Sequence, residues 1–264
     1  MDRTRAQGSL KAAQLCLEQQ LSDSAANRAY FAAFQAAIYA LEVQGIKRDE
    51  WTHKGVVHSD FAQFFVRRLK PDPIPEDTLK KIVDAGIHAP SGGNQQTWGF
   101  ILVRDPALKR FIRDHYWQTL QRLRGGSTLP SDAPPSWLRM MTAVAHLAEH
   151  LHEAPVILLA CAPQEFTPLA KAGSARASVA TIHGSIYPAV QNILLACRAL
   201  GVGATLTTLH GFFEEELKQQ LGIPAHLEIA ALIPLGFPQG NFGPTKCKPV
   251  DEVIHWDRWG SGKK

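Results

Sequence analysis

The loop from Ala89 to Val103 constrains this chain more than any other segment. Its sequence, APSGGNQQTWGFILV, places two adjacent glycines and several amide side chains between a predicted helix end and an apolar run. Glycine lets the backbone approach a neighbouring group closely, and amide side chains both donate and accept hydrogen bonds. We therefore expect this loop to contact a planar polar ligand, which indicates a bound cofactor.

The composition narrows the class of protein. The chain has 264 residues, 45% of them hydrophobic, enough for one substantial core or for a main domain with a small appended one. No apolar run reaches the roughly 18 residues of a membrane helix, and the first residues lack the apolar centre of a signal peptide, so we expect a cytosolic (cytoplasmic) protein with no membrane partner. The four cysteines lack metal-binding spacing, which predicts reduced thiols and no metal site. The net charge of +4 is modest and dispersed, so we expect no nucleic-acid partner.

The hydrophobic pattern divides the chain near Lys70. Residues from about Leu10 to Gly45 have helical spacing, and three prolines then precede an acidic helix start in KPDPIPEDTL. Beyond this boundary the pattern predicts strands at 99–105, 155–161, 204–209 and 227–235, and helices at 79–89, 106–120, 137–151, 187–200 and 213–221. Such an arrangement is typical of a layered α+β domain.

Four segments then point to one family. They are RRLKPDPIP from Arg67, APSGGNQQTWGFILVRDP from Ala89, SIYPAVQNILLACRALGVGATLTT from Ser185 and IPLGFPQGNFGPTKCKPVDEV from Ile233. In this order they resemble the nitroreductase family of FMN-dependent flavoproteins, over residues of about 67–259. The resemblance implies an α+β fold with a central mixed β-sheet flanked by helices, a homodimer, and FMN bound at the subunit interface.

The cations of two of these segments are candidate ligands of the FMN phosphate. In TKCKP, Lys246 and Lys248 alternate, so both ammonium groups face one side of an extended segment. The resemblance assigns them to the phosphate, together with Arg67 and its neighbour Arg68. An isolated KxK pair would otherwise be two solvated lysines.

The opening loop gains a more specific role from the resemblance. Pro90, Ser91 and Gly92 would present backbone and hydroxyl groups to the flavin of the partner subunit, and Asn94 would supply an amide. Taken alone, the same residues could form a helix C-cap and a turn. The family context favours the flavin contact.

The segment from Gly203 to Thr208 resembles the strand and turn whose backbone N–H donates to flavin N5. Such a donor stabilises the negative charge that reduction places on the ring, and it requires no particular side chain. The sequence leaves the donor open between Thr208 and Leu209. The cofactor-binding residues expected here are Leu206, Thr207, Thr208 and Leu209, unless the threonines are ordinary strand residues.

The resemblance also implies an activity. NADPH or NADH would give hydride to flavin N5 and leave, and a small electron-poor acceptor such as a nitroaromatic or a quinone would then take it. Stacking over the ring is the main demand, so no catalytic side chain is expected. The stretch from His115 to Met141, which includes Tyr116, is a candidate lid over the substrate.

The chain departs from the family pattern before Arg67. Gln63, Phe64 and Phe65 stand where nitroreductases carry further phosphate ligands. This leaves an alternative, a degenerate nitroreductase-fold protein that binds FMN weakly or not at all and has a non-catalytic role.

The preceding residues offer a reason for that departure. The segments at 26–41 and 52–68 resemble the first part of a helical HEPN domain. We therefore expect three parts: an incomplete HEPN-like head at 1–66, an FMN-binding domain at 67–259 and a flexible tail at 260–264. Neither charge nor a complete motif supports a nucleic-acid or toxin-partner role for such a head.

Overall fold

The computed structural model describes residues 69–125, 135–239 and 248–260 of the chain. The HEPN-like head expected at 1–66 lies outside these residues, as do Arg67, Arg68 and Lys246. Leu69, at the start of the described part, pairs with Pro238 just after the last strand, and the N–H of Lys70 donates to the carbonyl of Phe237 at 2.8 Å. The first described residues therefore lie beside the end of the last strand.

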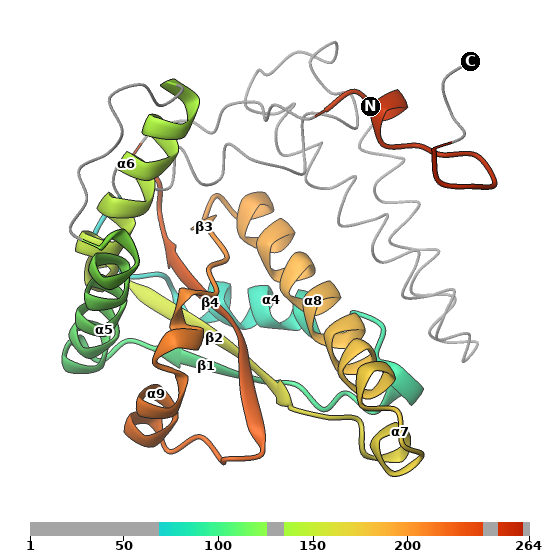
Figure 1. The fold of residues 1–264 in the computed structure, drawn as a ribbon. Coiled ribbons are helices and arrows are strands. Elements are labelled where there is room, and N and C mark those ends of the chain that lie inside the picture. Colours follow the sequence, from blue (N-terminus) through green and yellow to red (C-terminus); the bar gives the residue numbers. More distant parts are fainter. Residues whose placement is uncertain (1–68, 126–134, 240–247, 261–264) are drawn as a thin grey trace, which may run out of the picture.

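Within the described residues, four strands form one sheet in the order β1-β2-β4-β3 (Figure 1). Their bounds are β1 Gly99–Val103, β2 Val156–Pro163, β3 Gly203–Ala204 and β4 Leu227–Gly236. We expected a mixed sheet, but every pairing in this part of the chain is antiparallel.

The connections explain this difference. Val103 at the end of β1 pairs with Ile157 at the start of β2, so the two helices between these strands return the chain to the same end of the sheet. Neighbouring strands joined in this way run antiparallel. Strands β2 and β3 do point in the same direction, but β4 lies between them.

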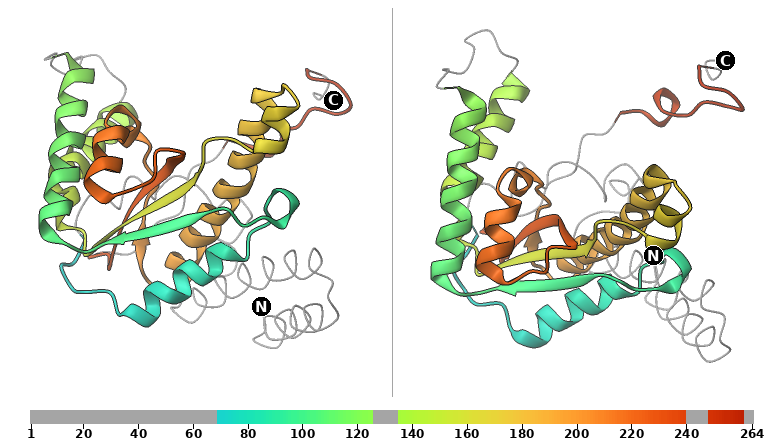
Figure 2. Two further views of the ribbon diagram at one scale, coloured as in Figure 1. Left: turned by 90° about the horizontal axis from the view of Figure 1, so that it is seen from below. Right: turned by 60° about the horizontal axis from the view of Figure 1, so that its bottom comes forward.

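Helices cover both faces of the sheet, as Figures 1 and 2 show. The α-helices are α4 Glu76–Ile87, α5 Pro106–Arg124, α6 Pro135–His150, α7 Thr167–Lys171, α8 Ala175–Ala199 and α9 Glu214–Leu221. Short 3-10 helices are η2 Gly92–Asn94, η3 Leu151–Glu153, η4 Leu209–Phe212 and η5 Val250–Glu252. The α+β class is confirmed.

The two faces of β2 belong to two hydrophobic clusters. Val156, Leu158 and Ala160 pack with α4 and α8 on one face, whereas Ile157 and Leu159 pack with α5 and α9 on the other. This strand is buried almost throughout, which explains why its sequence is continuously apolar rather than alternating. The prediction of a buried strand at 155–161 is confirmed.

The largest differences in length from the predicted elements are at α8 and β3. Helix α8 begins at Ala175 rather than Tyr187 and continues through Pro188, because Ser178, Ile182 and Ile186 already bury one face of it. The strand predicted at 204–209 ends at Ala204. Beyond it, a single bridge joins Thr207 to Leu232.

No α-helix in the described ranges combines the length and the apolar character needed to cross a lipid bilayer. The cytosolic location stays a prediction.

Candidate functional site

The 90–94 loop rests on the middle of α8. The N–H of Gly92 donates to Ser185 Oγ at 3.0 Å, and the N–H of Asn94 donates to the carbonyl of Ser91 at 2.9 Å. A Cβ at Gly92 would lie 2.6 Å from Thr181 Cγ2, so this glycine allows the close approach of loop and helix. Pro90 and Asn94 remain exposed beyond this contact.

The same loop holds its backbone in an unusual conformation. Asn94 and Gln96 have φ angles of 52° and 50°, in the left-handed region that residues other than glycine seldom adopt. Two hydrogen bonds of 3.0 Å stabilise it, from the Gln96 N–H to Ser91 Oγ and from Gln96 Nε2 to Asn94 Oδ1. Backbone strain of this kind is concentrated at binding and active sites.

The residues from Leu206 to Leu209, here called the 206–209 turn, are anchored at Thr207. The N–H of Thr207 donates to the Leu232 carbonyl at 2.9 Å, and its own carbonyl accepts from the Leu232 N–H at 3.0 Å. Its Oγ1 lies 2.7 Å from the hydroxyl of Tyr116 on α5. Three hydrogen bonds therefore fix this residue against the sheet and against α5.

Two backbone donors next to Thr207 point the other way. The carbonyl of Thr207 points toward β4, so the N–H of Thr208, in the same planar trans peptide unit, points away from β4. The alternation between the paired residues Ala204 and Thr207 turns the N–H of Leu206 the same way, toward the edge of the described sheet. Neither N–H donates to any residue in the described part of the chain. Both residues are exposed.

His210 anchors the far end of the 206–209 turn. Its Nε2 hydrogen-bonds the carbonyl of Ile229 on β4, and the side chain is 2% exposed. Burial lowers the pKa of this histidine, with smaller opposing effects from the hydrogen bond to Ile229 and from Glu214. The neutral ring, with its proton on Nε2, is therefore the form that the fold holds at neutral pH.

The sequence did not predict the anchoring role of Tyr116 or of His210. Tyr116 was expected in a lid, but it is 3% exposed and belongs to the core cluster beneath α5. His210 packs in the interior, with 2% of its surface exposed. The apolar positions one turn away from Tyr116, Ile112 and Leu120, could have placed it on the buried face of α5.

The 90–94 loop and the 206–209 turn lie far apart within one subunit. The loop precedes β1 and the turn follows β3, and these are the two edge strands of the described sheet, separated by roughly 14 Å. Within one subunit the loop and the turn therefore lie at opposite edges of the described sheet.

Of the predicted phosphate ligands, Lys248 is the one within the described residues. Its side chain is exposed at the start of the segment 248–260. This segment also exposes Val250, Val253, Trp256 and Trp259, the last with 91% of its surface accessible.

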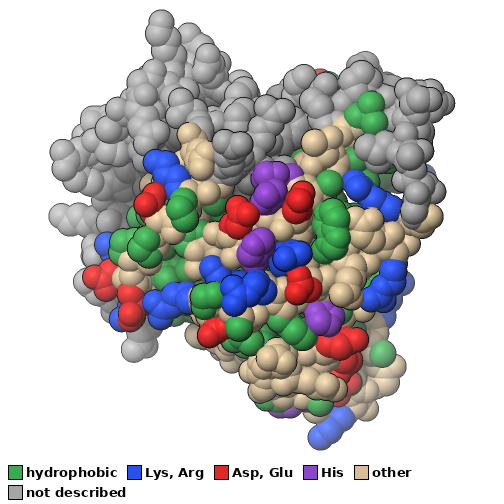
Figure 3. Space-filling view, turned by 90° about the vertical axis from the view of Figure 1, so that its left-hand side faces the viewer, with side chains coloured by type: hydrophobic (Ala, Val, Ile, Leu, Met, Phe, Trp, Pro, Cys, Tyr) green, Lys and Arg blue, Asp and Glu red, His purple; other side chains and the backbone are tan. Residues whose placement is uncertain are grey.

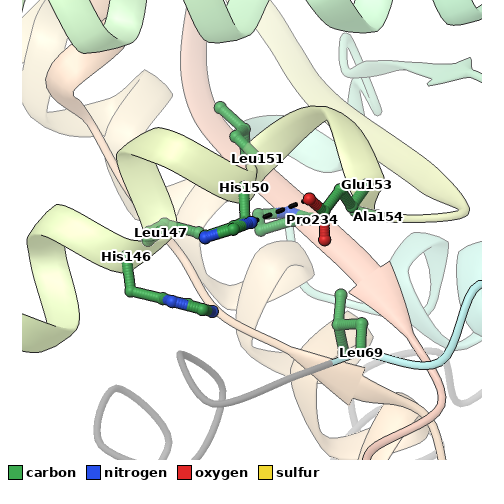
Figure 4. A pocket seen from close by; sticks show the side chains of 8 residues that line it. All are labelled: Leu69, His146, Leu147, His150, Leu151, Glu153, Ala154 and Pro234. Carbon is green, nitrogen blue, oxygen red and sulfur yellow. Dashed lines mark hydrogen bonds and ion pairs between the residues drawn. The ribbon is translucent and has the colours of Figure 1, made fainter.

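A small pocket between α6 and β4 is not the cofactor site. Its cavity of about 30 Å³ is lined by residues that include Leu69, His146, His150 and Pro234 (Figure 4), and it has room for about one water molecule. His150 Nδ1 lies 2.7 Å from Glu153 Oε1 at its rim. On this side of the molecule, cationic, acidic and histidine side chains are intermixed over the described surface (Figure 3).

Comparisons with known proteins identify the family of this chain. A family model described as the nitroreductase family matches residues 65–237. The chain is 31% identical over 195 residues to an NADH dehydrogenase of Thermus thermophilus, with 72% of this chain and 90% of that protein covered. It is 25% identical to iodotyrosine deiodinase 1 of Homo sapiens, with 72% of this chain and 64% of that protein covered. The crystal structure of oxidized iodotyrosine deiodinase bound to FMN and 3-iodo-L-tyrosine is similar at a TM-score of 0.54 and 26% identity, covering 74% of this chain and 93% of that one. The chain therefore belongs to the nitroreductase family.

Proposed function

We propose that this protein is an FMN-dependent oxidoreductase that passes electrons from NADPH or NADH to a small electron-poor acceptor such as a nitroaromatic or a quinone. Membership of the nitroreductase family supports a flavin-dependent oxidoreductase in general. One observation on this chain supports the proposal. The 206–209 turn directs the N–H groups of Leu206 and Thr208 to the edge of the sheet, and neither group has a hydrogen-bond partner among the described residues.

These donors fit the demands of a flavin. When bound, FMN supplies a ring nitrogen, N5, that takes up and passes on an electron pair. The N–H of Thr207 is already bonded to Leu232, and that of Leu209 makes a long contact of 3.4 Å with Thr207 Oγ1. Between the two candidates left open by the sequence, this favours Thr208 as the donor toward N5.

The site requires two subunits in this proposal. The 206–209 turn of one subunit would contact the flavin together with Pro90, Ser91, Gly92 and Asn94 of the other, because the two segments lie at opposite edges of one sheet. Members of the nitroreductase family are typically homodimers. We infer that this chain is a homodimer too.

The phosphate would be held by cations. We propose Lys246 and Lys248 as ligands, with Arg67 and Arg68, since charge-assisted contacts suit a doubly charged group. In the same proposal the residues 67–259 form the FMN-binding domain, residues 1–66 form a separate head and residues 260–264 form a tail.

The decisive experiment is FMN uptake by the purified protein. We expect yellow protein, flavin absorbance and about one FMN per subunit, together with oxidation of NADPH or NADH that depends on an added acceptor. The acceptor series includes a quinone, a nitroaromatic and an iodophenol, because one similar crystal structure holds 3-iodo-L-tyrosine. Colourless protein that does not take up added FMN would support the alternative, a degenerate fold with a non-catalytic role.

A further inference from the structure

Tyr116 is a buried tyrosine with one polar contact in the described structure. It lies on α5 with its ring in the hydrophobic cluster and only 3% of its surface exposed. Its hydroxyl is 2.7 Å from Oγ1 of Thr207, which is 91 residues away in the sequence. Burial raises the pKa of the phenol, with a smaller opposing effect from Thr207, so this is a hydrogen bond between two neutral hydroxyls.

Thr207 stands at the point where the sheet ends and the exposed turn begins. Both its N–H and its carbonyl are hydrogen-bonded to Leu232, so this bridge fixes the orientation of the Thr207 backbone. Its Oγ1 also receives the long 3.4 Å contact from the N–H of Leu209. The Thr207 hydroxyl therefore lies between the Tyr116 hydroxyl and the backbone of the turn.

We propose that Tyr116 is a positioning residue of the redox site, acting through Thr207 to aim the N–H of Thr208. The inference rests on the proposed function, since the aim of this donor matters when a flavin ring is bound. Without the Tyr116 hydroxyl, the Thr207 hydroxyl has lost its buried partner and is free to turn toward the N–H groups of the turn. The donor next to it is then less well oriented.

The effect should differ between oxidised and reduced FMN. N5 of the oxidised ring accepts a hydrogen bond through its lone pair, whereas two-electron reduction adds a hydrogen to N5 and negative charge to the ring, so the same N–H does not contribute equally to the two states. We expect Tyr116→Phe to change the ratio of the two binding constants by roughly three- to tenfold, the range of one neutral hydrogen bond. By linkage, the midpoint potential of the bound FMN shifts by about 14 to 30 mV.

The test measures that potential in four proteins: the wild type, Tyr116→Phe, Thr207→Val and the double variant. Tyr116→Phe keeps the ring that fills the core, so the fold is retained. Both single variants should shift the potential, and the double variant should shift it no further, because the two hydroxyls form one pair. Equal potentials in the wild type and Tyr116→Phe would overturn the inference, and so would additive shifts.

Thr119→Val on the same helix is the matched control. Thr119 is also 3% exposed, and its Oγ1 has no hydrogen-bond partner among the described residues. Removing this hydroxyl should leave the potential at the wild-type value. A shift as large as that of Tyr116→Phe would show that any change within α5 moves the potential, which contradicts a specific role for Tyr116.

A second readout needs no FMN. In the apo protein, hydrogen exchange at the Thr207 amide should be faster in Tyr116→Phe than in the wild type, by the same roughly three- to tenfold factor. Unchanged exchange would refute the positioning role by itself. Absence of FMN uptake by the wild type would instead refute the proposed function, and with it the redox consequence, so the two failures are distinguishable.

Discussion

Gly92 and Ser185 join the 90–94 loop to α8 through a hydrogen bond of 3.0 Å from the Gly92 N–H to Ser185 Oγ. A methyl group at Gly92 would lie 2.6 Å from Thr181 Cγ2, closer than side chains tolerate without a shift. We expect Gly92→Ala to lower the free energy of unfolding by about 1 to 3 kcal/mol, the usual cost of overpacking, and to weaken FMN binding. Urea denaturation and an FMN titration measure the two effects.

Gly99→Ala is the control for this change. Gly99 lies a few residues further along, in β1, and apart from its chain neighbours no atom of the described residues lies within 4 Å of the position that its Cβ would take. Its replacement should leave both stability and FMN affinity close to those of the wild type. Equal losses in Gly92→Ala and Gly99→Ala would contradict the close contact with α8.

His210 makes the stability of the fold depend on pH. Burial lowers its pKa below the ordinary value of 6.5, so the unfolded chain takes up a proton before the folded one does. The stability from this residue is therefore fully present above pH 6.5 and is lost as the pH falls toward the lower folded pKa. The free energy of unfolding should decrease below pH 6.5, as measured by denaturation at a series of pH values.

His210→Gln should flatten this dependence, because glutamine does not titrate and still carries an N–H for the Ile229 carbonyl. His152 contributes in the same direction, because burial and the nearby Arg113 lower its pKa as well. A smaller dependence of the free energy of unfolding on pH should therefore remain in His210→Gln. An unaltered slope in His210→Gln would refute the assignment.

Lys248→Ala tests the phosphate site with a residue that the structure describes. Its side chain is exposed, so we expect a loss of about 1.5 kcal/mol, or roughly tenfold in the Kd for FMN, and a larger loss when Lys246→Ala is added. The affinity of the wild type should also fall with added salt, because screening weakens such contacts. Titration of FMN fluorescence gives these constants.

Lys171→Ala removes another exposed lysine, at the end of α7, and should not change the Kd. An FMN affinity unaffected by the double change at Lys246 and Lys248 would show that other groups hold the phosphate.

The sequence predicted those features that local patterns encode. The start of α5 is one, since Asp105 accepts hydrogen bonds from the N–H groups of Ala107 and Leu108, and Pro106 occupies the first helical position. The continuously apolar β2 is another.

Features that depend on contacts distant in the sequence were missed. No local pattern links Tyr116 to Thr207, and the early start of α8 depends on packing that overrides Gly184 and Pro188. The bridge from Thr207 to Leu232 likewise replaces a strand with a turn whose N–H groups face outward. The candidate site was therefore predicted as segments, and their arrangement at opposite edges of the sheet came from the structure.

That arrangement predicts complementation between subunits. Ser91→Trp and Thr208→Trp each add a large side chain at one wall of the proposed site, and we expect either homodimer to bind little FMN. In a heterodimer of the two variants, one site combines both altered walls, whereas the other combines the unaltered 90–94 loop of one chain with the unaltered 206–209 turn of the other. That second site should bind FMN.

The heterodimer, isolated through two different affinity tags, should therefore hold about half of the FMN held by a doubly tagged wild-type dimer. A site built within one subunit gives a different result, because each chain of the heterodimer then carries one altered wall. Both of its sites would remain empty. FMN absorbance per dimer thus separates the two arrangements, and an empty heterodimer would contradict the site shared between the edge strands of two subunits.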